Sequence, residues 1–584
     1  MGTKISKIRI TIQKNRPYYF TIITFIVGVL LWSLTMVRNG LNYPYGVGFW
    51  GANGHDGIWH IALAESLSRG SLDNPVFSGF ALKNYHLGFD LLLALLNKIT
   101  SIPISILYFQ ILPIIFSILI GILVYKFVYE WRRSTNESLW ALFFVFFGSS
   151  FGFVVTYLRD RVITGESMFW SSQSSSTLIN PPFALSLIFI LWGLLFLIKY
   201  LKNSSIKYFI LIALMFGLLI QIKVYAGLLV LGGLFLVAIY NITFKRSPKI
   251  LYLFLSSILI SILLFIPFNK EASNSIQWQP FWFLETLMSY SDRLGWEKFY
   301  SAMTTYKMGK IWLKGIIFYG ISFIIFIIGN MGLRIIGFDF VVRILKRKEK
   351  INDVMIFIFS ILIAAILIPM FFVQRGTPWN TIQFFYYYLF FFSILAGIST
   401  SLLLEKLKYV FRRFLIIFIL LFTILGVWST MQHYLPLMPQ AKISTLEMEA
   451  LDFLKDQPQG VVLTYPFDAI MAKQAESNPP RPLFLYESTA YVSAFSQKDV
   501  FLEDEVNLNI MGYDWKKRRQ DVLDWYEESD EKKARQFLKD NNIAYVYWLK
   551  NLPGNTYQHA YLGDSQLGLT KIFENKEVTI FSNK

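Results

Sequence analysis

The sequence predicts a polytopic α-helical membrane protein with about 11 transmembrane helices and a C-terminal soluble α/β domain. Three observations support this prediction. The 584 residues are 54% apolar with a mean hydropathy of +0.46, far more apolar than an ordinary soluble protein. The apolar residues form runs of about 20, the length that crosses a hydrocarbon core of about 30 Å. After Pro439 the long apolar runs end, and the hydropathy pattern becomes that of the short helices and strands of a soluble domain.

Taken in order, the apolar runs are as follows. They lie near residues 18–37, 104–125, 139–158, 182–199, 208–222, 225–243, 250–268, 311–330, 353–373, 381–402 and 413–430. The first run is too long for the core of a signal peptide and lacks a small-x-small cleavage site, so we expect it to be retained. The apolar stretch from Tyr208 to Tyr240 is too long for one span, which predicts two helices joined by a very tight turn at Lys223.

The distribution of charged residues predicts how the chain is oriented in the membrane. The net charge is +17, but the tail from Pro439 onward holds 17 Lys and Arg against 22 Asp and Glu, so the basic excess belongs to the membrane part. This distribution argues against a nucleic-acid partner. With a cytoplasmic N-terminus, the short inner loops hold 24 Lys and Arg residues. An odd number of spans then places the loop 38–103 and the tail outside a plasma membrane.

These boundaries predict a transmembrane domain over residues 1–438, with a catalytic outer loop at 38–103, and an extracytoplasmic α/β domain over 439–584. In the loop we expect two helices on the membrane surface, Gly57–Arg69 and about Gly88–Ile99. The outer loop Asn269–Lys310 interleaves aromatic and charged residues, which predicts a pair of interfacial helices. In the tail we expect helices at Ser444–Gln457, Asp514–Glu527 and Glu531–Asn541, and strands at Val461–Tyr465, Tyr491–Phe495, Val500–Leu502, Ala544–Leu549, Leu569–Glu574 and Val578–Ser582.

Several chemistries are excluded. The chain has no cysteine, so it forms no disulfide, no thiolate metal site and no cysteine nucleophile. No glycine-rich phosphate loop follows a predicted strand, so the sequence shows no sign of a nucleotide or nucleotide-sugar site. A transferred group would therefore come from a donor already in the membrane.

Asp56 is the strongest site candidate. It opens the first surface helix at the outer membrane boundary, one helical turn before His60. Such a carboxylate could act as a general base towards a hydroxyl or hold a divalent cation. The alternative is that Asp56 caps the helix. For His55, His60 and His86 the alternative is a hydrogen-bonded interfacial histidine.

Other charged residues lie near the outer ends of spans. Lys223, Arg375, Arg159 and Arg161 could meet a lipid phosphate, because ionisable groups at membrane depth are costly without a partner. For Arg159 and Arg161 we favour snorkelling to the interface. A metal site could combine His60 with a second acid, Asp160 or Glu166.

The segment from Asn53 to Asp90 carries a family resemblance. Its elements HDGIWHIALAESLSRG, NPVF and NYHLGFDLLLALLNKI resemble the first outer loop of GT-C superfamily glycosyltransferases. The closer likeness is to the branch that uses polyprenyl-phosphate sugars, which includes protein mannosyltransferases and lipid A aminoarabinose transferases. The resemblance implies a GT-C-like membrane fold, Asp56 as base, and Lys83, Tyr85 and His86 near the lipid phosphate.

The sequence also departs from the family pattern. Many relatives have two adjacent acids where this chain has His55 and Asp56, and a Lys-Pro-Pro element where it has Tyr85–Gly88. The oligosaccharyltransferase signature of two tryptophans followed by Asp is absent from the tail, and MGYDW at Met511–Trp515 is not that motif.

The resemblance implies an inverting glycosyltransferase. It would move a hexosyl or pentosyl group from a polyprenyl-phosphate donor to a hydroxyl of a glycan, lipid or protein acceptor at the outer face. A basic residue or a divalent cation, Mg or Mn, would stabilise the leaving phosphate. The alternatives are a flippase or transporter of lipid-linked sugars, with broken helices near the midplane, and a GT-C-like scaffold without activity.

Overall fold

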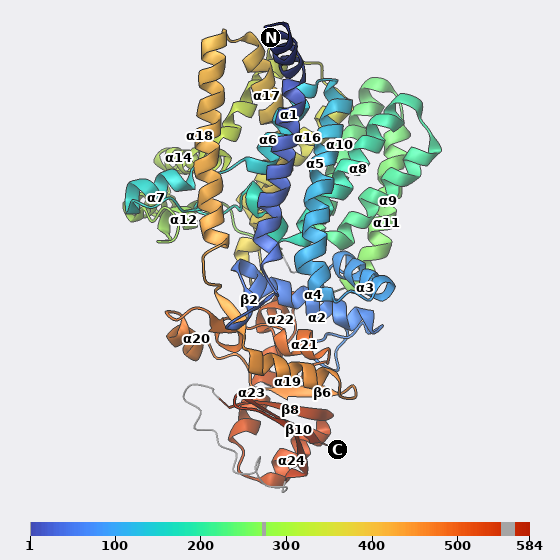
Figure 1. Cartoon of the computed structure of the whole chain (residues 1–584), viewed down its shortest axis with the longest axis vertical. Coiled ribbons are helices and arrows are strands. Elements are labelled where there is room, and N and C mark those ends of the chain that lie inside the picture. The colour runs from blue at the N-terminus through green and yellow to red at the C-terminus, as the bar shows by residue number, and fades with distance from the viewer. Residues whose placement is uncertain (1, 271–275, 551–566, 584) are drawn as a thin grey trace. The chain divides into compact units, whose positions relative to one another are not determined.

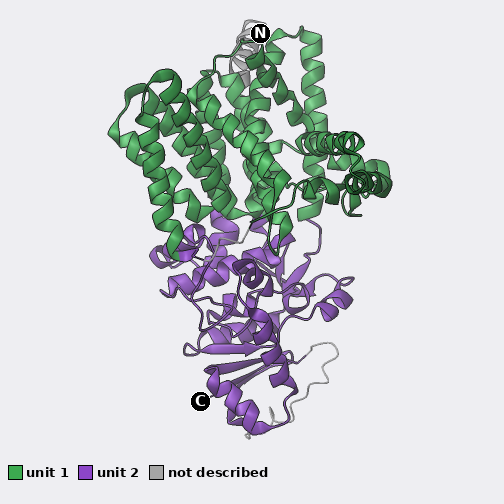
Figure 2. Ribbon diagram, turned by 180° about the vertical axis from the view of Figure 1, so that it is seen from behind, with its two compact units in different colours: residues 1–35, 113–267, 272–434 green, residues 36–112, 268–271, 435–584 purple. Residues whose placement is uncertain are grey.

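The computed structural model describes residues 2–270, 276–550 and 567–583, with side chains described from residue 19 onward. The chain divides into two compact units (Figure 2). The membrane unit comprises Met1–Thr35, Pro113–Pro267 and Ala272–Tyr434, and the loop-tail unit comprises Met36–Leu112, Phe268–Glu271 and Leu435–Lys584. The first loop therefore belongs to the same unit as the C-terminal region, although more than 300 residues separate them in the sequence.

The membrane unit is built from long apolar helices (Figure 1). They are α1 (Gly2–Val37), α5 (Leu112–Arg132), α6 (Thr135–Phe147), α7 (Gly152–Asp160), α8 (Pro181–Asn203), α9 (Ile206–Ile222), α10 (Val224–Lys245), α11 (Lys249–Phe265), α14 (Trp312–Met331), α16 (Asp353–Phe371), α17 (Gln383–Lys406) and α18 (Tyr409–Tyr434). Among the described residues, nine helices are long and apolar enough to cross a membrane, and the bent pair α6 and α7 makes ten. Together with the shorter α9 they match the eleven predicted runs, so the chain is a multi-pass membrane protein.

Lys223 lies where two membrane helices meet. α9 ends at Ile222 and α10 begins at Val224, and Lys223 between them has an extended backbone with φ −156° and ψ 110°. One extended residue is enough to stop the first helix and start the second. The predicted tight turn at Lys223 is confirmed.

The predicted span at 139–158 is a broken helix. α6 and α7 are bent by 43° at a break that begins at Gly148. Arg334 occupies this break, because its Nη2 donates to the carbonyl of Gly148 over 2.6 Å. A Cβ atom on Gly148 would overlap the guanidinium group, so glycine is required there. The break therefore depends on a contact with a residue far along the chain.

Arg334 itself is 1% exposed and fully hydrogen-bonded. Its donors meet Ser393 Oγ at 2.9 Å, Gln173 Oε1 at 3.0 Å, the Asn330 carbonyl at 3.2 Å, the Gly148 carbonyl at 2.6 Å and Ser174 Oγ at 2.9 Å. These five acceptors match the five N–H groups of a guanidinium. Arg334 thus fastens the broken helix, η3 (Ser174–Ile179) and α17 together.

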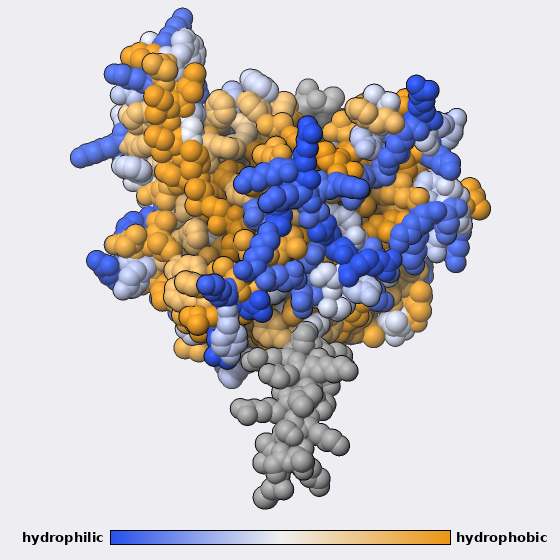
Figure 3. Space-filling view, turned by 90° about the horizontal axis from the view of Figure 1, so that it is seen from above, coloured by the Kyte–Doolittle hydropathy of each residue, from blue (hydrophilic) through white to orange (hydrophobic). Residues whose placement is uncertain are grey.

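The predicted inner loops come together at one end of the membrane unit. Their ion pairs are Arg132 with Glu137 at 2.7 Å, Arg132 with Glu349 at 2.8 Å, Lys202 with Glu130 at 3.7 Å and Lys245 with Asp353 at 2.5 Å. Figure 3 looks onto the end where α1 begins, and hydrophilic side chains gather across its middle with apolar side chains around them. The alternation of the predicted spans is consistent with this gathering, whereas the cytoplasmic assignment stays a prediction.

The loop Asn269–Lys310 contains the predicted helix pair. The helices are α12 (Trp282–Ser289) and α13 (Glu297–Met308), and α12 packs against α14 and α16. A short strand before them, β3 (Ile276–Trp278), pairs antiparallel with β4 (Phe372–Gln374). The sequence did not predict these two strands.

The loop-tail unit contains two four-stranded sheets. The first has the order β1-β2-β5-β7, with β1 (Asn42–Tyr43), β2 (Gly46–Phe49), β5 (Ala441–Ile443) and β7 (Arg481–Pro482). β2 of the first loop pairs antiparallel with β5 of the tail, with Gly48 opposite Lys442. Backbone hydrogen bonds therefore join the loop directly to the tail.

The second sheet is formed by the tail alone. Its order is β6-β8-β10-β9, with β6 (Val461–Thr464), β8 (Ile543–Leu549), β10 (Val578–Asn583) and β9 (Leu569–Glu574). β6 and β8 are parallel, and the other pairs are antiparallel. Helices α23 (Trp515–Glu527) and α24 (Glu531–Asp540) contribute Trp525 and Leu538 to the core beneath it. The predicted α/β character of the tail is confirmed, as is the helix predicted at Ser444–Gln457, which is α19 (Thr445–Lys455).

Two predicted strands of the tail are wrong. Residues Tyr491–Phe495 form a helix, α21 (Tyr491–Ser496), and Val500–Leu502 forms only an isolated bridge from Val500 to Val462. The buried carboxylate of Glu503 accepts hydrogen bonds from the backbone N–H groups of Val492 and Ser493 in the first turn of α21. A carboxylate at that end stabilises a helix, so a tertiary contact overrides the strand propensity of the sequence.

The two helices of the first loop differ in exposure. α2 (Asp56–Ser68) is buried from Gly57 to Ser66 and packs against α3 and α21, so the prediction of a surface helix is wrong for it. Its residues are apolar on most sides, which suits burial within protein. α3 (Gly88–Thr100) instead exposes Leu91, Leu95 and Ile99, spaced four residues apart, by 48%, 56% and 71%. This stripe is typical of a helix that lies on a membrane surface.

Candidate active site

Asp56 is the first residue of α2, directly after the turn η1 (Gly51–Gly54). The N-cap of α2 is His55, which makes no side-chain capping bond, and Asp56 is the acidic residue of the first turn. The Asp56 side chain is 58% exposed, and its Oδ1 atom lies 2.9 Å from Nδ1 of His55. Asp56 thus presents an accessible carboxylate that the preceding residue holds on one side.

His55 links Asp56 to the tail. The imidazole is 6% exposed, and its Nε2 atom lies 3.2 Å from Oδ1 of Asp504, which is fully buried. Burial of the ring opposes its charged form, but the carboxylates of Asp504 and Asp56 outweigh burial and raise the pKa of His55 well above 6.5. This three-residue contact, with partners 449 positions apart, was not predicted from the sequence.

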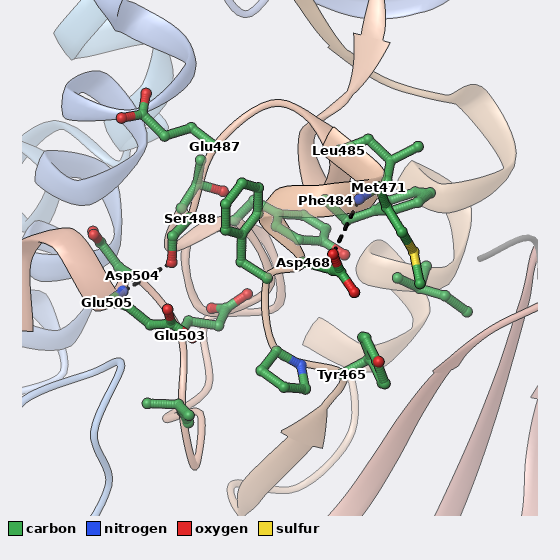
Figure 4. Close-up of a pocket in the computed structure, with 16 residues that line it drawn as sticks. Tyr465, Asp468, Met471, Phe484, Leu485, Glu487, Ser488, Glu503, Asp504 and Glu505 are labelled. Atoms are coloured by element: carbon green, nitrogen blue, oxygen red, sulfur yellow. Dashed lines mark hydrogen bonds between the residues drawn. The ribbon is translucent and has the colours of Figure 1, made fainter. Parts of the chain in front are cut away.

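Asp504 also lines a cavity in the tail (Figure 4). The cavity has a volume of about 30 Å³, and its lining includes Tyr465, Asp468, Phe484, Glu487, Ser488, Thr489, Tyr491, Glu503, Asp504 and Glu505. Of the described residues, those that line it comprise five carboxylates and no Lys, Arg or His. In Figure 4, Glu487 and Asp504 lie on one side of the cavity and Asp468 on the other.

Burial raises the pKa of three cavity carboxylates, Glu487, Glu503 and Glu505. Burial raises the pKa of Glu503 to about 8, although its contacts with two backbone N–H groups oppose the shift. Burial also raises the pKa of Glu487, with His55 as the strongest opposing charge and Asp56 and Asp504 as like charges. Glu487 therefore belongs to the same electrostatic cluster as Asp56.

His60 does not pair with Asp56. Its Nδ1 atom lies 2.7 Å from Oδ1 of the fully buried Asp90, and its ring stacks on Tyr108 with centroids 5.8 Å apart. This contact joins α2 to α3 inside the protein. The predicted pairing of Asp56 and His60 is wrong, and the alternative of a hydrogen-bonded histidine holds for His60.

The predicted metal residues do not form a site. Asp160 pairs with the neighbouring Arg159 at 2.8 Å. Glu166 is buried, and its oxygens accept from Gln173 N at 2.9 Å, Ser176 Oγ at 2.7 Å and Tyr434 OH at 3.4 Å. Over the described residues, no three His, Asp or Glu side chains gather as metal ligands. A divalent cation stays a prediction, to which His60, Asp160 and Glu166 contribute no common site.

The candidate phosphate ligands of the first loop lie close to α2. Tyr85 packs edge-on against Trp59 of α2 and stacks on His86, with ring centroids 5.5 Å and 4.7 Å apart. Lys83 Nζ lies 5.0 Å from the ring centre of Tyr513, a residue of the tail. The structure therefore brings Lys83, Tyr85 and His86 into the unit that holds Asp56, while their role at a phosphate stays a prediction.

Lys223 and Arg375 belong to the membrane unit. Lys223 is 6% exposed, and its Nζ donates to Oδ1 of Asn180 over 3.3 Å. Lys223 Nζ also lies 5.5 Å from the ring of Tyr225, whose hydroxyl donates to Gln374 over 3.0 Å. Arg375 follows Gln374 and is exposed. The hydrogen bond between Tyr225 and Gln374 therefore joins the segment that carries Lys223 to the segment that carries Arg375.

Sequence reasoning missed Arg293. Its guanidinium lies 4.2 Å from the ring centre of Trp170, and its side chain is 16% exposed. Within the described part of the chain, its buried Nε atom has no hydrogen-bond acceptor. The only signal for Arg293 in the sequence is the interleaving of aromatic and charged residues around it. The Nη1 atom of Arg293 lies 3.4 Å from Asp292. A half-buried guanidinium with one free N–H donor is a further candidate for a phosphate.

Comparison with known proteins gives a likeness of fold. No protein-family model matches the sequence, and a search of curated proteins finds no match. The chain is similar to the archaeal oligosaccharyltransferase AglB from Archaeoglobus fulgidus in complex with an inhibitory peptide and a dolichol-phosphate, with 13% identity, a TM-score of 0.47, and coverage of 91% of this chain and 69% of that chain. The same enzyme tethered to an acceptor peptide containing the NVT sequon gives 13% identity, a TM-score of 0.49 and coverage of 91% and 69%.

The chain is also similar to ArnT from Cupriavidus metallidurans in the apo state, with 11% identity, a TM-score of 0.36, and coverage of 96% of this chain and 97% of that chain. At these identities and scores the likeness assigns no role to any residue of this chain.

Proposed function

We propose that this protein is a membrane glycosyltransferase that moves a sugar from a polyprenyl-phosphate donor to an acceptor hydroxyl at the outer face. The observation that carries the proposal is the accessible Asp56 carboxylate, held by His55 at the start of α2 and in the same unit as an acid-lined cavity. The sequence resemblance of this loop to GT-C glycosyltransferases supports the same reaction.

The proposed reaction is a displacement with inversion. Asp56 accepts the proton of the acceptor hydroxyl as the hydroxyl oxygen bonds to the anomeric carbon. The bond from that carbon to the phosphate oxygen breaks, and its electron pair leaves with the polyprenyl phosphate. The leaving group remains in the bilayer because of its lipid tail. Lys83, Tyr85, His86, Lys223 and Arg375 are the proposed partners of its negative charge.

Substitution of Lys223 tests whether this residue binds the phosphate of the donor. We expect Lys223→Met to raise the donor KM about 10- to 100-fold, because a hydrogen bond to a charged group contributes about 1.5–3 kcal/mol. Lys223→Arg keeps the charge and should recover part of the loss. The measurement is the initial rate of transfer against donor concentration. Lys207→Met, at an exposed position, is the control. An unchanged donor KM in Lys223→Met would remove Lys223 from the donor site.

The cavity supports a class of acceptor. Burial keeps Glu503 mostly protonated at neutral pH. Asp504 pairs with His55, and Glu505 pairs with Arg519. The remaining carboxylates, with no basic side chain among the described lining residues, create a negative potential that repels anions. The hydroxyl of Thr489, a residue that is 5% exposed, has no hydrogen-bond partner among the described residues. We infer that the acceptor carries an uncharged or cationic hydroxyl-bearing group.

A matched pair of acceptors tests this class. We expect a neutral hexoside to exceed the corresponding uronate in kcat/KM by at least about tenfold, because each tenfold corresponds to only about 1.4 kcal/mol of repulsion. The measurement is competition between the two acceptors at a fixed donor concentration. Raising the salt concentration should reduce the difference. Equal use of the two acceptors would contradict the assignment of the cavity.

The activity itself is tested by transfer of radiolabel from a panel of polyprenyl-phosphate sugars onto membrane extract. We expect label in an acceptor product with the wild-type chain and a strong loss with Asp56→Asn. Movement of labelled lipid across the membrane by both proteins, without any product, would instead support the transporter alternative. Neither transfer nor movement from any donor would favour the inactive scaffold.

A further inference from the structure

The His55 ring lies between two carboxylates of the loop-tail unit. Its Nδ1 atom is 2.9 Å from Asp56 and its Nε2 atom is 3.2 Å from Asp504. Both ring nitrogens therefore face acceptors, an arrangement that the doubly protonated imidazolium satisfies. One carboxylate, Asp56, is exposed, and the other, Asp504, is fully buried. The contact joins an accessible reactive group to the interior of the tail.

Asp504 is held firmly in place. It is the N-cap of α22 (Glu505–Met511), where its side chain accepts from Asn507 N at 3.1 Å and from Asn507 Nδ2 at 2.8 Å. Its backbone is left-handed, with φ +49°, which is uncommon for a residue other than glycine. Such a conformation persists only where the surroundings determine it strongly. Asp504 is thus a fixed point against which the His55 ring is oriented.

We propose that His55 and Asp504 are positioning residues for Asp56, so that the tail sets the orientation of the reactive carboxylate. This inference rests on the proposed role of Asp56. The Asp504 carboxylate holds the His55 ring, and the His55 N–H holds Oδ1 of Asp56. The carboxylate then keeps one orientation while remaining accessible to an acceptor hydroxyl. Fixing a reacting group in this way lowers the entropy lost on reaching the transition state.

The arrangement predicts a pH dependence. The charged groups that face His55 are Asp56, Asp504 and Glu487, all carboxylates. They raise the pKa of His55 in the folded protein above its unfolded value of about 6.5. The stabilising contribution of the pair is therefore fully present below pH 6.5 and is lost as the pH rises through the folded pKa. We expect transfer activity to fall over the same alkaline range.

A measurement that needs no activity tests the contact. The chain has only five histidines, so isotope-labelled histidine can be titrated by NMR in the full-length protein in detergent. We expect one histidine to titrate well above pH 6.5, and its signal to be absent in His55→Asn. Asp504→Asn keeps an acceptor oxygen but removes the charge, so it should lower this pKa by at least about one unit, a tenfold change in proton affinity. Asp524→Asn, at an exposed position of the tail, is the control and should not change it.

Transfer kinetics test the positioning role. His55→Asn places an amide N–H near the Nδ1 position and should retain part of kcat, whereas His55→Gln reaches towards Asp504 and should retain less. Asp504→Asn should move the alkaline limb of the kcat profile to lower pH by at least about one unit. If His55 and Asp504 had a purely structural role, their substitution would lower the yield of folded protein without moving the alkaline limb of the kcat profile.

The outcomes separate this inference from the proposed function. If Asp56→Asn is fully active, the proposed function fails whatever the His55 variants do. If Asp56→Asn is inactive while His55→Asn, His55→Gln and Asp504→Asn leave both the kcat profile and the histidine titration unchanged, the proposed function stands and the positioning role is overturned. A shifted titration together with a shifted alkaline limb supports it.

Discussion

Asp56→Asn is expected to lower kcat for sugar transfer by about 10²- to 10⁴-fold, the usual contribution of a positioned general base. Asparagine has nearly the same shape as aspartate, and its amide oxygen can still accept the hydrogen bond from His55 Nδ1. The variant should therefore fold normally and bind the donor with an unchanged KM. Only the step that takes the proton from the acceptor hydroxyl is lost, which is why the effect should fall on kcat.

The control for this result is Asp73→Asn, which changes an exposed aspartate of the same loop. It should transfer sugar at the wild-type rate. Both variants should first be compared with the wild type in thermal midpoint and in elution on size exclusion, so that misfolding is recognised. A correctly folded Asp56→Asn that retains full activity with a suitable donor and acceptor would refute the assignment of Asp56 as the base.

Arg334→Met is expected to destabilise the folded protein by about 3–5 kcal/mol, since each buried acceptor left without its donor costs about 1–3 kcal/mol. The variant leaves the Gly148 and Asn330 carbonyls and the Gln173 side chain without the guanidinium, all in a buried region. Methionine fills much of the volume but donates no hydrogen bond. The break between α6 and α7 should loosen first, because Arg334 bonds directly to Gly148.

The measurement is the thermal midpoint and the yield of folded protein in one detergent. Arg334→Lys keeps a charge with three donors in place of five, so its loss should be smaller than that of Arg334→Met. Arg412→Met, at an exposed position of α18, is the matched control and should leave the midpoint unchanged. An Arg334→Met protein as stable as the wild type would show that the hydrogen bonds of Arg334 do not hold the broken helix.

The broad architecture was predictable because it depends on local composition. Hydrocarbon excludes exposed backbone polar groups, so each apolar run of sufficient length must form a helix wherever it lies in the bilayer. The turn at Lys223 was predictable for the same reason, since one helix could not contain all the residues from Tyr208 to Tyr240. In the tail, β8, β9 and β10 followed from alternating or continuous apolar residues between turn signals.

The errors have a common cause. The sequence around Tyr491 favours a strand, but the Glu503 carboxylate, eleven or so positions away, binds the first turn of α21. The sequence of α2 predicts an interfacial helix. Asp90 forms a hydrogen bond with His60 of α2, and this bond permits the burial of α2. In each case a polar side chain from another segment forms a hydrogen bond that stabilises the observed structure. A prediction from local propensity does not include such a bond.

The sequence by itself determined that this is a multi-pass helical membrane protein with an α/β tail, and it singled out Asp56 as the residue to test. Only the tertiary structure decided what surrounds Asp56. His55 is adjacent in sequence, but Asp504 is 449 positions from His55, and the pairing of β2 with β5 brings the loop and the tail into one unit. Periodicity and composition show whether a segment is surrounded by lipid, protein or water. The partner of a buried charge depends instead on long-range contacts, which only the folded chain specifies.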